Sequence, residues 1–239
     1  MSNLTILHLF PETLRLNGES GNVLALSNRA TAADVKVKIH KVELGGMLPK
    51  KRPELIFLGA GTLQATILAS KQLERWDSQI HQWISEGSKV LAVGSGFDLA
   101  SQGLILADGS RLHGLSLTNT THRITSNHLV GEVFLNKSFA GFINSDREIA
   151  RSDAALSLGT VMQSDNQELI GYVDGYRDGK VWASNVQGPL LPMNPSFADE
   201  ILAAAVAGYR PSAKLRSIDS LATKAREAIS IRVGNRVGL

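Results

Sequence analysis

The sequence contains no cysteine, and only 5% of its residues are aromatic. The absence of cysteine excludes disulfide bonds, thiolate metal sites and a cysteine nucleophile within this chain. Because aromatic residues are scarce, aliphatic side chains must fill most of the core. Hydrophobic residues make up 43% of the chain and charged residues 20%. This balance is typical of a packed globular protein and argues against global disorder.

Long apolar segments are also missing. No stretch approaches the roughly 18 apolar residues that a membrane-spanning helix needs. The first ten residues, MSNLTILHLF, lack the basic start and the long apolar run of a signal peptide. We therefore expect a cytoplasmic protein without membrane insertion, which a partner could still hold near a membrane.

Positive charge is concentrated at the C-terminal end. The whole chain carries a net charge of +3, whereas residues 209–239 hold seven basic residues against two acidic ones. The segment has no nucleic-acid-binding motif, so we interpret it as a solvated basic helix and expect no nucleic-acid partner.

Short apolar runs alternate with helical patterns over the first hundred residues, which predicts an α/β fold with a mainly parallel sheet flanked by helices. The predicted strands are Leu4–Phe10, Val35–Val42, Glu54–Leu58 and Val90–Val93. Helices are predicted for Gly21–Asp34, for one long segment with an apolar stripe from Leu63 to Ile84, and from about Phe97.

The second half has a different texture. After about Gly103, short strand-like pieces such as HLVGEVFLN and KVWASNV predict extra β-rich segments that complete or flank the sheet. A helix is predicted for Ser196–Ala207, ended by Gly208, and a basic amphipathic helix from about Ser217 to Ile231. We expect one domain over residues 1–208 and a basic C-terminal helical appendage over residues 209–239.

Two glycine loops follow predicted strands, at the sheet edge where ligands bind in such folds. The first, Gly59-Ala60-Gly61, lacks the third glycine of a dinucleotide fingerprint and the Lys-Ser/Thr of a phosphate-binding loop, which favours a tight turn. The second, Gly94-Ser95-Gly96, resembles a nucleophile elbow, but glycine stands at its tip and Ser95 comes one residue later.

A catalytic serine would also need a histidine base and an acid. The six histidines show neither that spacing nor a metal-binding spacing. We therefore expect no metal and no cofactor.

Four segments together resemble a known family. HLFPETLRLNGESGNVLAL is similar to the family pattern H-L-Y-P-D-x-x-x-x-Y-G-D-x-G-N, and the Gly59 loop lies where the family has a glycine triplet followed by Gln-Asp. VLAVGSGFDL is similar to L-A-V-C-G-G-Y-Q-L, and NVQGPLLPMNPSFAD to Y-L-H-G-P-L-L-P-K-N-P-x-L-A-D. The family is the cobyric-acid-synthase-like branch of class I glutamine amidotransferases, and in particular the glutaminase subunits of lipid II isoglutaminyl synthases.

The resemblance implies a class I amidotransferase fold and a glutaminase reaction. In the family, a cysteine attacks the side-chain amide of glutamine, and a histidine takes the thiol proton and returns it to the leaving ammonia. Backbone amides near the glycine loop would hold the oxyanion. The ammonia passes to a Mur-ligase-like partner in a heterodimer, which amidates a carboxylate of the peptidoglycan stem peptide.

This sequence departs from the family at the positions that carry the chemistry. The cysteine position is Gly94 and the histidine position is Gln187, so neither catalytic residue is intact. Asp98 replaces the glutamine after the elbow, and Thr62-Leu63 replaces the Gln-Asp pair. Arg123 lies about where the family has an arginine that could pair with the substrate α-carboxylate.

These departures leave three hypotheses. The chain is a pseudoenzyme that serves a Mur-ligase-like protein as a non-catalytic partner, or it is an active glutaminase that supplies ammonia through Ser95 or Asp98. Alternatively, it is a sensor that binds glutamine or another small ligand. The candidate ligand-binding residues are Gly59, Gly61, Ser95, Asp98 and Arg123.

Overall fold

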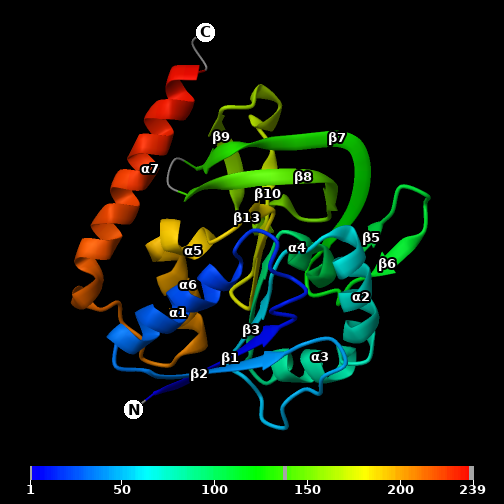
Figure 1. The fold of residues 1–239 in the computed structure, drawn as a ribbon, viewed down its shortest axis with the longest axis vertical. Coiled ribbons are helices and arrows are strands. Elements are labelled where there is room, and N and C mark those ends of the chain that lie inside the picture. Colours follow the sequence, from blue (N-terminus) through cyan, green and yellow to red (C-terminus); the bar gives the residue numbers. More distant parts are fainter. Residues whose placement is uncertain (1, 137–138, 237–239) are drawn as a thin grey trace.

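The computed structural model describes residues 2–136 and 139–236 and is built around a six-stranded sheet (Figure 1). The strand order is β11-β12-β4-β3-β1-β2, and all neighbouring pairs are parallel except β11 with β12. The strands are β1 (Asn3–Leu9), β2 (Lys36–Val42), β3 (Leu55–Leu58), β4 (Lys89–Val93), β11 (Tyr176–Arg177) and β12 (Val181–Ser184). Because the strands are parallel, the loops after β1, β3 and β4 meet at one edge. The predicted mainly parallel sheet is confirmed.

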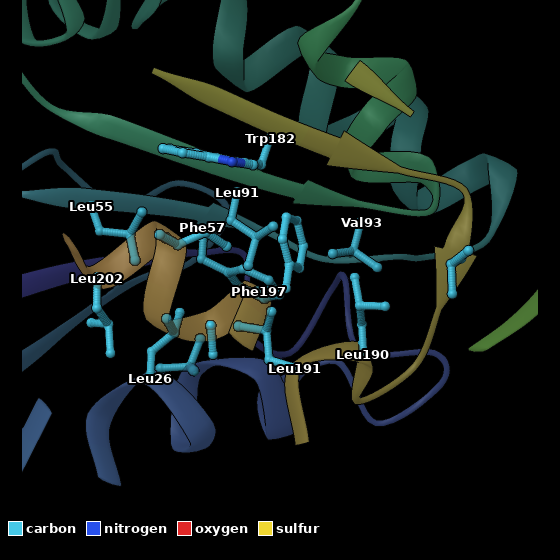
Figure 2. Close-up of a cluster of buried hydrophobic side chains, with 14 of the residues drawn as sticks. Leu26, Leu55, Phe57, Leu91, Val93, Trp182, Leu190, Leu191, Phe197 and Leu202 are labelled. Carbon is cyan, nitrogen blue, oxygen red and sulfur yellow. The ribbon is translucent and has the colours of Figure 1, made fainter. Parts of the chain in front are cut away.

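Helices cover both faces of this sheet, which explains why β3 and β12 are buried along their whole length. One face carries α1 (Ser20–Ala32), α5 (Leu190–Met193) and α6 (Pro195–Ala205). The other carries α2 (Leu63–Glu74), α3 (Asp77–Ser85) and α4 (Ser95–Ala100). Figure 2 shows the first face, where Leu26, Phe197 and Leu202 meet Phe57 and Leu91 of the sheet.

The single long helix predicted between Leu63 and Ile84 is wrong, because the structure has two helices there, α2 and α3. The chain leaves the helix at Trp76, whose φ of −105° and ψ of −2° depart from helical values. Trp76 stacks on Phe10, with ring centroids 5.7 Å apart and planes at 12°. This long-range packing outweighs the continuous apolar stripe.

A second sheet of seven strands lies beyond the carboxyl ends of the parallel strands (Figure 1). Its centre is the long hairpin of β7 (Thr120–Leu135) and β8 (Phe139–Arg151). The other strands are β5 (Gly103–Ile105), β6 (Arg111–His113), β9 (Gly159–Ser164), β10 (Val173–Asp174) and β13 (Val186–Gln187). This sheet confirms the β-rich second half. The pairing of β13 with β8 sets Gln187 opposite Phe142 and so fixes its place near the parallel sheet.

The C-terminal segment packs on the body. Three short 3-10 helices, η1 (Ala154–Leu156), η2 (Gln167–Leu169) and η3 (Ala213–Leu215), precede the last helix, α7 (Arg216–Arg236), which is longer than the predicted range. Its Ile229 and Val233 are buried in a cluster with Phe134 and Ala140. The predicted division of the chain into a domain over residues 1–208 and an appendage over residues 209–239 stays a prediction. Within residues 2–136 and 139–236, no helix is both long enough and apolar enough to cross a membrane.

Candidate functional site

The turn between β4 and α4 keeps the shape of a nucleophile elbow. Gly94 at its tip has a φ of +58° and a ψ of −125°, a conformation that residues with a side chain adopt only under strain. A Cβ at Gly96 would lie 2.5 Å from the carbonyl oxygen of Leu58, so glycine there lets α4 approach the end of β3. Glycine at both positions thus permits this tight turn between the strand and the helix.

The space above Gly94 is closed by Ala60. A Cβ at Gly94 would lie only 2.7 Å from the Cβ of Ala60, which real Cβ atoms essentially never do. The same atom would lie 3.4 Å from Cγ of Gln187. The structure therefore brings Gly94 and Gln187 together. It also identifies Ala60, a residue that sequence reasoning passed over because an alanine within a glycine loop gives no chemical signal.

Gln187 is held by hydrogen bonds from both ends of its amide. Its side-chain oxygen accepts a hydrogen bond from the Asn17 amide, and its amide nitrogen donates to the carbonyl oxygen of Asn144. These contacts join the loop after β1 to strand β8 across the site. Because a carboxamide does not take up a proton near neutral pH, Gln187 can bridge these segments but cannot serve as a general base.

Ser95, the first residue of α4, is turned toward the glycine loop. Its hydroxyl oxygen accepts a hydrogen bond from the backbone N–H of Gly61 at 2.9 Å. The resemblance implies that backbone amides near this loop hold an oxyanion, and here a side chain occupies the amide of Gly61. Within the described part of the chain, no histidine bonds to the Ser95 hydroxyl. The geometry fits a structural clasp between α4 and the loop.

Asp98 is the centre of a buried polar chain. One carboxylate oxygen lies 2.7 Å from Nδ1 of His122, and the other accepts a hydrogen bond from Nε of Arg147 at 2.9 Å. The other ring nitrogen of His122 lies 3.0 Å from the Thr120 hydroxyl. Asp98 and His122 are almost fully buried. Both carboxylate oxygens are therefore engaged, and the charge is compensated by Arg147, as buried charges generally are.

A cavity of about 300 Å³ lies beside the elbow, between the Gly59–Gly61 loop, the start of α4 and strand β8. Gly61, Ser95 and Asp98 line it, as the sequence predicted for a ligand site, whereas Gly59 is not among its described lining residues. Arg123 is exposed on β7 and also lies outside the described lining. Arg147 of β8 is the arginine that reaches the cavity. Sequence reasoning missed it because only the pairing of β7 with β8 carries it there.

Beneath the loops, Glu19 is fully buried at the start of α1. Burial raises the pKa of its carboxyl to about 8, although a hydrogen bond from the Gly188 N–H, 3.2 Å from Oε1, opposes the rise. Its other oxygen has no hydrogen-bond partner among the described residues. A Cβ at Gly59 would lie 3.0 Å from Cβ of Glu19, so this side chain packs against the glycine loop. Glu19 thus supports the two loops that carry Gly61 and Gln187.

No group of three histidine, aspartate or glutamate side chains in the described ranges could hold a metal ion. Arg147 lines the cavity and carries a positive charge there. Two acidic side chains, Asp98 and Asp146, form ion pairs with that arginine. Its positive charge is consequently largely compensated before any ligand arrives.

Comparison with known proteins places this site in a family. Residues 5–195 match the CobB/CobQ-like glutamine amidotransferase domain. The chain is 24% identical over 206 residues to the GatD subunit of the glutamine-hydrolyzing lipid II isoglutaminyl synthase of Staphylococcus aureus (strain N315), covering 84% of each chain. It is 26% identical over 211 residues to the corresponding subunit of Streptococcus pneumoniae (strain ATCC BAA-255 / R6), covering 85% of this chain and 80% of that subunit.

A solved glutamine amidotransferase has the same fold, with a TM-score of 0.50 and 12% identity over 83% of this chain and 98% of that chain. The resemblance of the four sequence segments is confirmed. The family match spans most of the chain and includes both glycine loops, the elbow at Gly94 and the position of Gln187. The chain therefore belongs to the CobB/CobQ-like glutamine amidotransferase family.

Proposed function

We propose that this chain is a glutamine amidotransferase-like subunit that no longer hydrolyses glutamine and acts as the non-catalytic partner of a Mur-ligase-like protein. The observation that carries the proposal is the elbow itself. Gly94 keeps the strained backbone of a nucleophile turn, Ala60 fills the space of a side chain there, and Gln187 takes the place of the base. The relatives are named as subunits of glutamine-hydrolyzing lipid II isoglutaminyl synthases, and this supports a role in the amidation of lipid II.

Loss of catalysis follows from the chemistry of the residues present. Hydrolysis of a carboxamide by this family's route needs a nucleophile and a base that act as a unit, and removing one member already lowers the rate by orders of magnitude. The two residues that could substitute are both engaged. The Ser95 hydroxyl accepts the Gly61 N–H, and the Asp98 carboxylate is bound by His122 and Arg147.

The charges of the cavity favour a scaffold over an amino-acid sensor. A free amino acid such as glutamine presents a carboxylate, which needs an uncompensated cation or several free amides. Arg147 is shared between Asp98 and Asp146, and the Gly61 amide is taken by Ser95. A free carboxylate would have to displace existing ion pairs. The preserved fold and the family-like segment Gly188–Asp199, which contains α5 and the start of α6, instead support a role in assembly with a partner.

Co-expression with the Mur-ligase-like protein encoded nearest to this chain tests the proposal. We expect the two proteins to co-purify as a heterodimer, and the ligase to gain thermal stability or amidation activity with added ammonia. A Mur ligase from another step of the pathway is the matched control and should not co-purify. Separate migration of the two proteins at micromolar concentration would remove the partner role.

A further inference from the structure

A second cavity, of about 450 Å³, lies at the opposite end of the molecule from the elbow. It is bounded by the first residues of β1, by the edge strand β2 and by Pro49, Lys51 and Arg52 of the following loop. Strand β1 runs from Asn3 at this cavity to Leu9 at the edge that carries the candidate site. Seven residues of strand span about 20 Å, so the two cavities are separate.

The lining is strongly basic. Strand periodicity directs alternate residues to one face, so Lys36, Lys38 and His40 of β2 line the same cavity. The parallel register pairs Lys36 with Asn3 and Lys38 with Thr5, both of which also line it. The loop after β2 then returns and adds two more cationic side chains, Lys51 and Arg52.

The four cationic side chains Lys36, Lys38, Lys51 and Arg52 have no ion-pair partner in the described part of the chain. No acidic residue of the described chain lines the cavity. The nearby Glu54 carboxylate accepts a hydrogen bond from the Thr5 N–H at 2.6 Å. Arg52 is held in place because its guanidinium donates a hydrogen bond to the Ser88 hydroxyl at 3.3 Å.

Protection of a sheet edge does not explain the whole arrangement. Lysines on an edge strand discourage pairing with another chain, and this accounts for Lys36 and Lys38. Lys51 and Arg52 come from a loop rather than from the unpaired edge, yet they line the same cavity. Four formal cations around a hollow of this volume, without an acid among the described lining residues, favour a ligand of high negative charge density.

We propose that this basic cavity binds an oligophosphate, such as a pyrophosphate or triphosphate group. Lysine ammonium groups bind phosphate as point charges, and the arginine fork can bind two phosphate oxygens at once. The group could belong to a soluble molecule or to a phosphorylated lipid, because both present the same oxygens. The basic cavity shares no lining residue with the cavity beside the elbow. Oligophosphate binding therefore does not depend on whether the chain hydrolyses glutamine.

Calorimetric titration of the full-length protein with sodium tripolyphosphate tests the proposal, at low ionic strength and at about 0.15 M salt. The test variant is Lys38→Glu/Lys51→Glu. The matched control is Lys71→Glu/Lys224→Glu, which changes net charge equally at exposed lysines outside the cavity. We expect the control variant to bind like the native protein. The affinity of the test variant should fall at least about tenfold, since each charge reversal replaces an attraction by a repulsion.

A parallel arm identifies the source of the phosphate. Sedimentation with vesicles of a polyprenyl pyrophosphate in phosphatidylcholine, using the same variants, detects recognition of a lipid that carries a pyrophosphate group. Loss of binding by the test variant but not by the control variant, in either experiment, supports phosphate recognition. The experiment in which the loss occurs shows whether the phosphate belongs to a soluble molecule or to a lipid. Equal weakening of both variants would show a non-specific charge effect, and absence of binding by the native protein in both arms would overturn the proposal.

Discussion

The steric cost of a side chain at Gly94 should disappear when the Ala60 methyl group is removed, and this coupling can be measured as a double-mutant cycle. The substitution Gly94→Ala introduces two separate penalties. The backbone conformation, with φ at +58° and ψ at −125°, is strained for alanine by about 1–3 kcal/mol. The new Cβ would also lie 2.7 Å from the Cβ of Ala60, well inside the usual contact distance of about 3.5–4.0 Å, and such overpacking costs about 1–3 kcal/mol.

Removing the Ala60 methyl group separates the backbone strain from the steric overlap. Ala60→Gly alone should lower the free energy of unfolding by about 1–2 kcal/mol, because a buried methyl group is lost and the unfolded chain gains freedom. In that background Gly94→Ala should cost only the backbone strain. The interaction free energy between the two sites should therefore be about 1–3 kcal/mol, with the double variant more stable than the sum of the single effects predicts.

Urea denaturation of the native protein, the two single variants and the double variant measures this term. The control pair is Gly94→Ala with Ala69→Gly, because Ala69 is equally buried but lies in α2. We expect the control pair to be additive within about 0.5 kcal/mol. Additivity in the Ala60 pair as well would refute the steric account of the closed elbow.

Three further results are expected. Glu19→Gln should abolish most of the pH dependence of stability between about pH 4.5 and 8. The pKa of the Glu19 carboxyl is raised in the folded state, so the unfolded chain ionises first, and the unmutated protein loses up to about 5 kcal/mol of stability as pH rises through this range. Urea titrations at several pH values should show this slope in the unmutated protein and not in the variant. Ile229→Ala should lower the free energy of unfolding by about 2–5 kcal/mol in a single transition, whereas an independent appendage at residues 209–239 would leave the main transition unchanged. Ser95→Ala should cost about 1–3 kcal/mol by leaving the Gly61 N–H without its acceptor, and a melting temperature equal to that of the native protein would show that the clasp is unimportant.

The sequence allowed the sheet and the elbow to be predicted because both depend on local patterns. Apolar runs such as Val90–Val93 indicate buried strands wherever they occur, and a glycine-rich turn after such a run indicates the ligand edge. The break at Trp76 could not be predicted, since it depends on stacking against Phe10, which is distant in the sequence. Local periodicity carries no information about such a partner.

The lining of the site was predicted only in part. The resemblance placed Gln187 near Gly94, and the structure brings them together through the pairing of β13 with β8. Arg147 was missed because its approach to Asp98 depends on the register of the long β7/β8 hairpin, which contains a bulge between Ile124 and Leu129. A register of this kind is set by tertiary packing over many residues. The contact of Ala60 with Gly94 is likewise a property of the folded loops alone.

We propose that this member of the family has kept the fold and lost the reaction. The most direct measurement is ammonia release from glutamine by the purified native chain, alone and in complex with its Mur-ligase-like partner, beside an active glutaminase as positive control. We expect no ammonia above the buffer level, either from the chain alone or from the complex. Ammonia release that persists through purification and disappears in Ser95→Ala would contradict it, and would make Ser95 a nucleophile rather than a clasp.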